Sequence, residues 1–210
     1  MTLLHWFALV WIATCLLSAA WIAVDVVRRP PRMWIMALVW PLTALYLGPL
    51  VGWFHARSRR DARRPFWESV LTGSLHCGAG CAVGDFAGEW LVFLLGLEIF
   101  GSDLLAKYLF AFALAYVVGI FFQYFSIAPM RNLSFGAGIA AALKADTLSL
   151  AAFEVGMFLW MPVTQKVLLP GLDPTRIEYW FMMQIAMSCG LVTTFPVNWW
   201  LLRRGWKERM

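Results

Sequence analysis

Residues 76–89 of this 210-residue chain read HCGAGCAVGDFAGE, from His76 to Glu89. The stretch places an imidazole, two thiols and two carboxyl groups within a segment that otherwise has the composition of a membrane span. An aspartate or lysine inside a span costs about 2.5–3.5 kcal/mol on insertion scales. A span with several such groups is expected to face protein, a bound ion or water. These residues are therefore the first candidates for a functional site.

The composition of the chain is that of a polytopic membrane protein. Apolar residues make up 61% of it and charged residues 14%, whereas a soluble domain has about 45–50% and roughly 25%. Because a span needs about 20 apolar residues, the chain has room for six spans and for no separate soluble domain. Its net charge of +5 comes from arginine clusters between apolar runs. Such clusters are typical of membrane anchors, so the expected partner is the lipid bilayer and not nucleic acid.

We expect an all-α fold, a polytopic transmembrane helical bundle of about six spans in a single domain, residues 1–210. The expected spans are Thr2–Val27, Met33–Phe54, Val70–Ile99, Leu104–Ile127, Gly136–Val163 and Ile177–Leu202. An even number of spans places both termini on one side, and the basic Arg57–Arg64 loop assigns that side to the cytoplasm. The Arg28–Arg32 loop then violates the positive-inside rule. This exception indicates either that the second segment is misassigned or that the third is partly re-entrant.

The polar residues of the third expected span line one face of a helix. Those that recur every fourth residue are Cys77, Cys81, Asp85 and Glu89. A stripe of small residues lies beside them, formed by Gly80, Gly84 and Gly88. Small residues at this spacing let another helix approach closely. The polar face is therefore expected to meet a partner helix at short range.

The fifth and sixth expected spans add further candidates. The third and fifth spans together carry four carboxyl groups against one lysine, Lys144, so some carboxyl groups are protonated or a cation is present. Thiols, imidazole and thioethers suit Cu(I) or Zn. The candidate metal ligands are His76, Cys77, Cys81, Asp85, Glu89, Asp146, Glu154, Met183 and Met187.

Three functions fit these features. The first is binding or translocation of a transition-metal cation, Cu(I) or Zn, between the third, fifth and sixth expected spans. The second is a membrane-embedded thiol oxidoreductase or metal-dependent enzyme that uses Cys77 and Cys81. The third is a non-catalytic subunit or assembly factor of a larger membrane complex, which implies a membrane-protein partner or a homo-oligomer. Whether the protein is an enzyme stays open.

Several strings are similar to those of a known family. They are MWIMALVWPLTALYLGP at 33–49, HCGAGCAVGD at 76–85, FQYFSIAPM at 122–130, KADTLSLAAFEVGMFLWM at 144–161, FMMQIAM at 181–187 and PVNWWLLRRGWKE at 196–208. From about Met33 to the C-terminus the chain resembles a bacterial family of small polytopic membrane proteins, domain of unknown function 4396. The resemblance implies a multi-pass protein of the bacterial inner membrane without an assigned activity. It also implies that Asp85, Glu89, Lys144, Asp146, Glu154 and Gln184 stand at family-motif positions.

Overall fold

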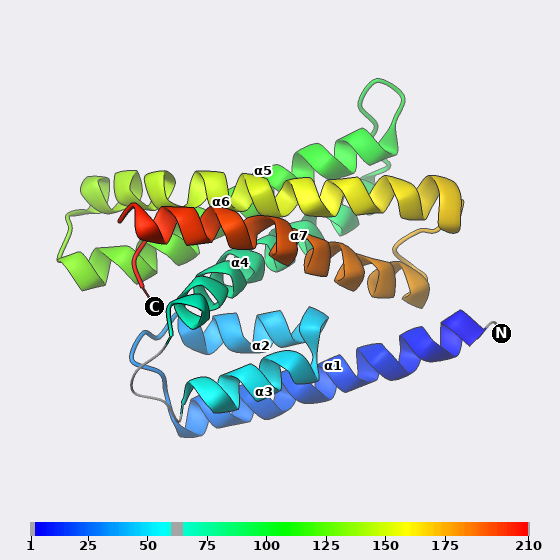
Figure 1. The fold of residues 1–210 in the computed structure, drawn as a ribbon. Helices are drawn as coiled ribbons and strands as arrows, with labels where there is room; N and C mark the ends of the chain where they lie inside the picture. The colour runs from blue at the N-terminus through cyan, green and yellow to red at the C-terminus, as the bar shows by residue number, and fades with distance from the viewer. Residues whose placement is uncertain (1–2, 60–64, 210) are drawn as a thin grey trace.

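The structure is a computed structural model that describes residues 3–59 and 65–209. Within these residues the chain is an all-α bundle (Figure 1), as the sequence predicts. The helices long and apolar enough to cross a membrane are α1 (Leu3–Arg28), α4 (Phe66–Leu95), α5 (Asp103–Arg131), α6 (Phe135–Val163), which the π-helical turn η1 (Thr164–Leu168) extends, and α7 (Ile177–Arg203). The protein is therefore a multi-pass membrane protein with five candidate spans in its described part.

The expected second span is instead a hairpin of two short helices, α2 (Met36–Leu47) and α3 (Pro49–Ser58). Between them Gly48 has a φ of 56°, a conformation that favours glycine. Pro49 starts α3, where a missing backbone N–H is tolerated. At about 1.5 Å per residue α2 is only about 18 Å long, whereas the hydrocarbon core is about 30 Å thick. The hairpin therefore enters the bundle and turns back (Figure 1).

Contacts with α1 fix both ends of this hairpin. A Cβ atom at Gly48 would lie 2.9 Å from Sγ of Cys15, near the middle of α1. At the other end, Nε2 of His55 lies 2.9 Å from Oδ2 of Asp25, one turn before the end of α1. Arg59 also pairs with Asp25, at 3.2 Å. The hairpin thus begins and ends beside the C-terminus of α1, and its tip lies halfway along that helix.

Because α2 and α3 form a hairpin, the arginine clusters gather at one end of the bundle, here called the basic end. Its described members are Arg28, Arg29, Arg32, Arg57, Arg59, Arg131, Arg203, Arg204 and Arg209. Arg57 pairs with Glu68 at the start of α4, and Arg209 lies over the ring of Phe66. This grouping removes the conflict with the positive-inside rule.

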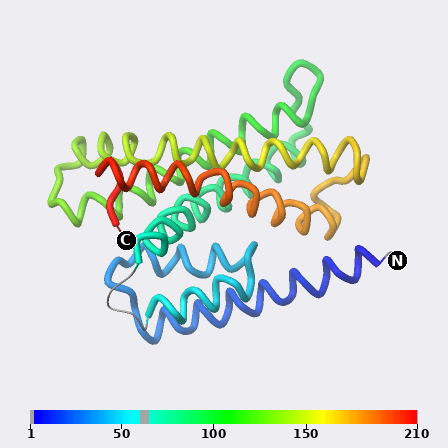
Figure 2. Tube along the Cα trace, viewed as in Figure 1, coloured from blue at the N-terminus to red at the C-terminus, as the bar shows by residue number. Residues whose placement is uncertain are grey.

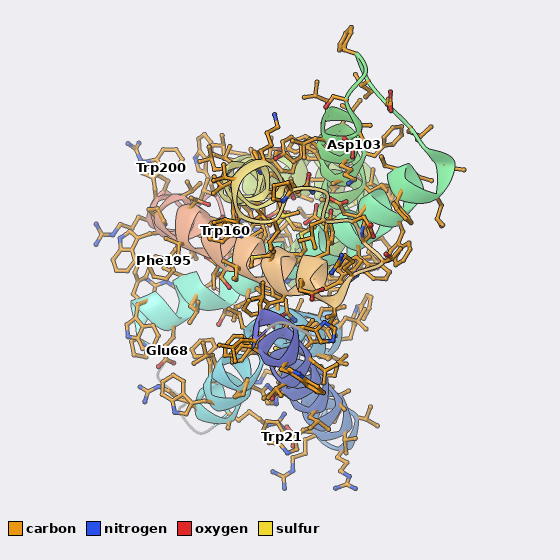
Figure 3. The ribbon with its side chains drawn as sticks, turned by 90° about the vertical axis from the view of Figure 1, so that its right-hand side faces the viewer. Trp21, Glu68, Asp103, Trp160, Phe195 and Trp200 are labelled. Atoms are coloured by element: carbon orange, nitrogen blue, oxygen red, sulfur yellow. The ribbon has the colours of Figure 1, made fainter. Side chains whose placement is uncertain are left out.

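The described chain runs from Leu3 at the opposite end, the N-terminal end, to Arg209 at the basic end (Figure 2). The expectation that both termini share one side assumes a full second span, whereas in the described chain residues 36–58 form a hairpin that does not cross the bundle. Figure 3 views the bundle from the N-terminal end, with Asp103 at the start of α5 and Trp200 at the periphery.

Helix α4 lies at the centre of the bundle because of its small residues. Half of the most apolar 18-residue stretch of α4 is buried, whereas only 22% of the corresponding stretch of α1 is buried. A Cβ atom at Gly84 would lie 2.1 Å from the backbone nitrogen of Ala115, and one at Gly80 would lie 3.0 Å from Cα of Gly119. The predicted close approach is confirmed, and α5 is the partner helix. This packing leaves the polar face of α4 buried among its neighbours.

Candidate functional site

All nine candidate ligands are buried, and their contacts divide them into three groups along the bundle. Cys77, Cys81, Asp85, Glu154, Met183 and Met187 lie in the middle, Glu89 lies toward the N-terminal end, and His76 and Asp146 lie toward the basic end. The nine residues therefore do not form the single site that the sequence suggests.

The middle group contains a cluster that we call the central site, formed by Cys77, Cys81, Asp85 and Glu154. The Cys81 thiol contacts that of Cys77 and lies beside Glu154. Asp85 is within electrostatic range of Glu154. In the part of the chain that the structure describes, neither oxygen of the Asp85 carboxyl group has a hydrogen-bond partner, and the neighbour of Glu154 is the Cys81 thiol, a weak donor. Buried polar atoms are rarely left in this state, and a proton, a cation or water would each satisfy them.

The surroundings of the central site are rich in sulfur. Met157, Met183 and Met187 pack in the same cluster as Cys77 and Cys81. Thioethers and thiolates are the ligands that Cu(I) prefers. Among the described residues, however, no three His, Cys, Asp or Glu side chains come together in an arrangement that could hold a metal ion.

Glu89 has partners that Asp85 and Glu154 lack. The Tyr179 hydroxyl donates a hydrogen bond to Glu89. Nζ of Lys107 lies 3.9 Å from Oε2 of Glu89 and 3.3 Å from Oδ2 of Asp103. All of these groups except the exposed Asp103 are buried. The charge of Glu89 is therefore compensated from the N-terminal end.

A cavity of about 310 Å³ opens at this end, and Lys107 forms part of its wall. Three carboxyl groups also line it: Glu98, Asp103 and Asp173. Hydrogen bonds from the side chain and backbone of Thr175 lower the pKa of Asp173, which lies in the loop before α7. The Lys107 side chain, which pairs with Glu89, therefore separates Glu89 from an acidic cavity that is accessible to water.

At the basic end, Asp146 forms a second buried ion pair. Nζ of Lys207 lies 3.0 Å from Oδ1 of Asp146 and 3.3 Å from Oγ of Ser149. Ser149 donates to Asn198, which donates through Nδ2 to Ser74 on α4, each at 3.0 Å. The network therefore joins α4, α6, α7 and the segment after α7.

His76 lies on the α5 side of this network. Its Nε2 atom is 3.5 Å from Oγ of Ser126, and Lys207 is close enough to act on it electrostatically. Within the described residues, His76 Nδ1, Asp146 Oδ2 and both amide atoms of Gln123 have no hydrogen-bond partner. An unpaired buried polar atom costs about 1–3 kcal/mol, and bound water is the usual remedy.

The three groups lie in succession along the bundle, and together we call them the polar file. It runs from the Asp146–Lys207 pair through the central site to the Glu89–Lys107 pair. On α4 alone it extends from Ser74 to Glu89, about 22 Å at 1.5 Å per residue. That length covers most of a hydrocarbon core of about 30 Å.

Neither lysine of this file is among the candidate residues that the sequence patterns indicate. Lys144, the one lysine of the third and fifth expected spans, is exposed, with Nζ 4.8 Å from the ring centre of Trp206. Lys107 and Lys207 enter from the ends of spans, where lysines are usually solvated anchors. The only available signal was the spacing of Asp103 and Lys107, which suits an ion pair across one helical turn.

Tyr46, at the tip of the hairpin, was also missed because it lies in the segment expected to be a plain span. Its hydroxyl would be 2.4 Å from a Cβ atom at Gly78, and it lies within electrostatic range of Cys77 and Cys81. Gln184 holds the same tip, because its Nε2 donates to the carbonyl of Leu45 at 2.6 Å. The hairpin therefore closes one side of the central site.

Comparison with known proteins identifies one family. The family described as "Domain of unknown function (DUF4396)" matches residues 66–207, which include α4 to α7, all nine candidate ligands, Lys107 and Lys207. The match begins later than the expected start near Met33. Searches of curated proteins and of solved structures find no match. Since the match covers well over half of its length, the chain belongs to the DUF4396 family.

Proposed function

We propose that this protein is a membrane transporter in which protons and a small cation compete for the central site. The observation that carries the proposal is a contrast between carboxyl groups on one polar file. Glu89 and Asp146 each have a buried lysine partner, whereas Asp85 and Glu154 lie together without one in the described structure. The central site is thus short of positive charge.

The lack of a positive charge near Asp85 and Glu154 suggests how protons and a cation could be coupled. Two neighbouring carboxylates in a low-dielectric interior repel each other and lose hydration, so they do not both stay charged without compensation. Protons or a cation can supply the compensation. Binding of the cation then releases protons from Asp85 and Glu154, and rebinding of protons releases the cation. This competition couples the two movements.

The remainder of the polar file supplies routes to the two ends of the bundle. Toward the N-terminal end, Glu89 and Lys107 connect the central site to the acidic cavity. Toward the basic end, the unpaired atoms of His76, Gln123 and Asp146 indicate positions for water. The Lys207 side chain closes this route, because it is 3% exposed and fills the space between Asp146 and Gly73.

The donor atoms favour Cu(I) as the cation over Zn. Two thiols with thioethers nearby suit Cu(I), which accepts soft ligands. A structural zinc site needs four ligands in a tetrahedral set, whereas the central site supplies two thiols, Cys77 and Cys81. The thiol-enzyme and assembly-factor interpretations remain alternatives.

We further propose that the basic end faces the cytoplasm of a bacterial cell. Nine described arginines lie there, whereas the N-terminal end carries Lys107, Lys166 and Arg176. The positive-inside rule then places the start of α1 outside and the end of α7 inside.

The test is proton flux in proteoliposomes that contain a pH-sensitive dye, driven by an imposed membrane potential, with and without Cu(I). Asp85→Asn and Glu154→Gln should each reduce flux at least tenfold, whereas Lys144→Gln, which removes an exposed charge outside the polar file, should reduce it less than twofold. Equal flux in all three variants and in the wild type, or flux no higher than in empty liposomes, would overturn the proposal.

A further inference from the structure

Two exposed arginines, here called the arginine pair, converge on one aromatic ring at the basic end of the bundle. The guanidinium carbon of Arg203, the last residue of α7, lies 5.9 Å from the ring centre of Phe66 at the start of α4. That of Arg209 lies 4.9 Å from the same ring centre. Arg203 also lies 5.1 Å from the ring centre of Trp199, which packs edge-on against Phe66. These rings therefore hold two positive charges close together.

The arginine pair has no negative partner among the described residues. Glu68, in the first turn of α4, pairs with Arg57. Glu208, in the segment after α7, pairs with Arg131. A guanidinium on a ring face keeps the N–H groups at its edge free, and such groups bind phosphate oxygens in pairs. The two exposed, unpaired guanidinium groups therefore have the chemistry of a phosphate site.

An apolar strip along α7 leads to the arginine pair. The ring of Phe195, which lies at the periphery of the bundle (Figure 3), is 6.1 Å from that of Trp199, one turn further on. Val192, about one turn before Phe195, is 71% exposed. From Val192 to Arg203 the strip is about 17 Å long at 1.5 Å per residue. This is close to half of a hydrocarbon core of about 30 Å, so the strip has the length of one lipid leaflet.

We infer that this surface binds an anionic phospholipid of the phosphatidylglycerol type. The phosphate accepts hydrogen bonds from the arginine pair, and an acyl chain lies along the apolar strip. A free phosphate ion has no apolar part to cover the strip. A zwitterionic phospholipid carries its own positive group, which opposes the two arginine charges, whereas phosphatidylglycerol has a net negative charge and an uncharged glycerol.

Titration of the full-length protein in detergent with phosphatidylglycerol, with bound lipids counted by native mass spectrometry, tests the inference. Phosphatidylcholine with the same acyl chains should bind at least tenfold more weakly, and inorganic phosphate should not displace phosphatidylglycerol. Arg203→Gln/Arg209→Gln should weaken binding at least tenfold. Trp199→Leu keeps both charges but removes one ring, and should weaken binding about threefold.

Arg28→Gln/Arg32→Gln is the matched control, because it removes the same charge from exposed positions at the same end. Neither of these arginines lies over an aromatic ring in the described structure, so phosphatidylglycerol binding should stay within twofold of that of the wild type. Equal loss of binding in the two double variants would show attraction by net charge alone and overturn the inference. Equal binding of phosphatidylcholine, or displacement of the lipid by inorganic phosphate, would overturn it too.

Discussion

Lys207 and Asp146 form an ion pair in which both side chains are fully buried, with 3.0 Å between Nζ and Oδ1. Lys207 lies beyond the last residue of α7, so the segment after that helix folds back into the bundle. The Lys207 ammonium also contacts Ser149, which belongs to the hydrogen-bonded network with Asn198 and Ser74. Lys207 is thus part of the core, and its side chain closes the polar file at the basic end.

Removal of one member of this pair should be strongly destabilising. Lys207→Met leaves the Asp146 carboxylate buried and unpaired, which costs about 3–5 kcal/mol in comparable sites. The double variant Lys207→Met/Asp146→Leu should recover most of that loss, since no charge remains buried. Thermal unfolding in detergent, followed by size-exclusion chromatography, measures both. Lys144→Met is the matched control, because Lys144 is exposed, and its melting temperature should equal that of the wild type.

The close contact between α4 and α5 leads to a second prediction, on the thermal stability of two glycine variants. Gly84→Ala places a methyl group where the backbone of Ala115 already lies, so the helices must separate at a cost of about 1–3 kcal/mol or more. Gly136→Ala, in α6, meets no atom within 4 Å and gains helix propensity of up to about 1 kcal/mol. Unfolding temperatures should therefore fall for Gly84→Ala and stay level or rise for Gly136→Ala. The same change of temperature in both variants would contradict the packing described for α4.

Sequence patterns predicted the elements that depend on local chemistry. The four-residue spacing of Cys77, Cys81, Asp85 and Glu89 and the glycine stripe beside them were sufficient to predict a buried polar face and a close helix contact. The hairpin was missed because hydropathy treats residues 33–54 as one apolar run. Only Gly48 and Pro49 mark the turn, and a proline in a span is also compatible with a kink.

The pairing of charges could not be predicted for a different reason. Lys107 and Lys207 lie at the ends of spans, and a lysine there can extend either to water or into the bundle. Its direction depends on which helices are neighbours, so it is a property of the tertiary structure. The division of the nine candidate ligands into three groups has the same origin.

Accessibility of engineered cysteines tests the hairpin. If α2 and α3 turn back at Gly48, Arg32→Cys and Arg209→Cys should react with an impermeant maleimide from the same side of the membrane. Glu98→Cys, in the loop between α4 and α5, should react from the opposite side. Intact spheroplasts and inverted vesicles give the two sides separately. Labelling of Arg32→Cys from the same side as Glu98→Cys would show that the second expected span crosses the membrane, and would contradict the hairpin.

Retention of copper tests the identity proposed for the cation. The central site holds Cys77 and Cys81 beside two carboxyl groups, whereas Cys15 and Cys189 lie outside it. Protein purified anaerobically without an affinity metal should therefore contain near-stoichiometric copper by elemental analysis. Cys77→Ser/Cys81→Ser should lose it, because a hydroxyl is a poor ligand for Cu(I), and Cys15→Ser/Cys189→Ser should keep it. Equal copper in the two double variants would remove Cu(I) from the central site. Competition between protons and another cation would then have to rest on Asp85 and Glu154 alone.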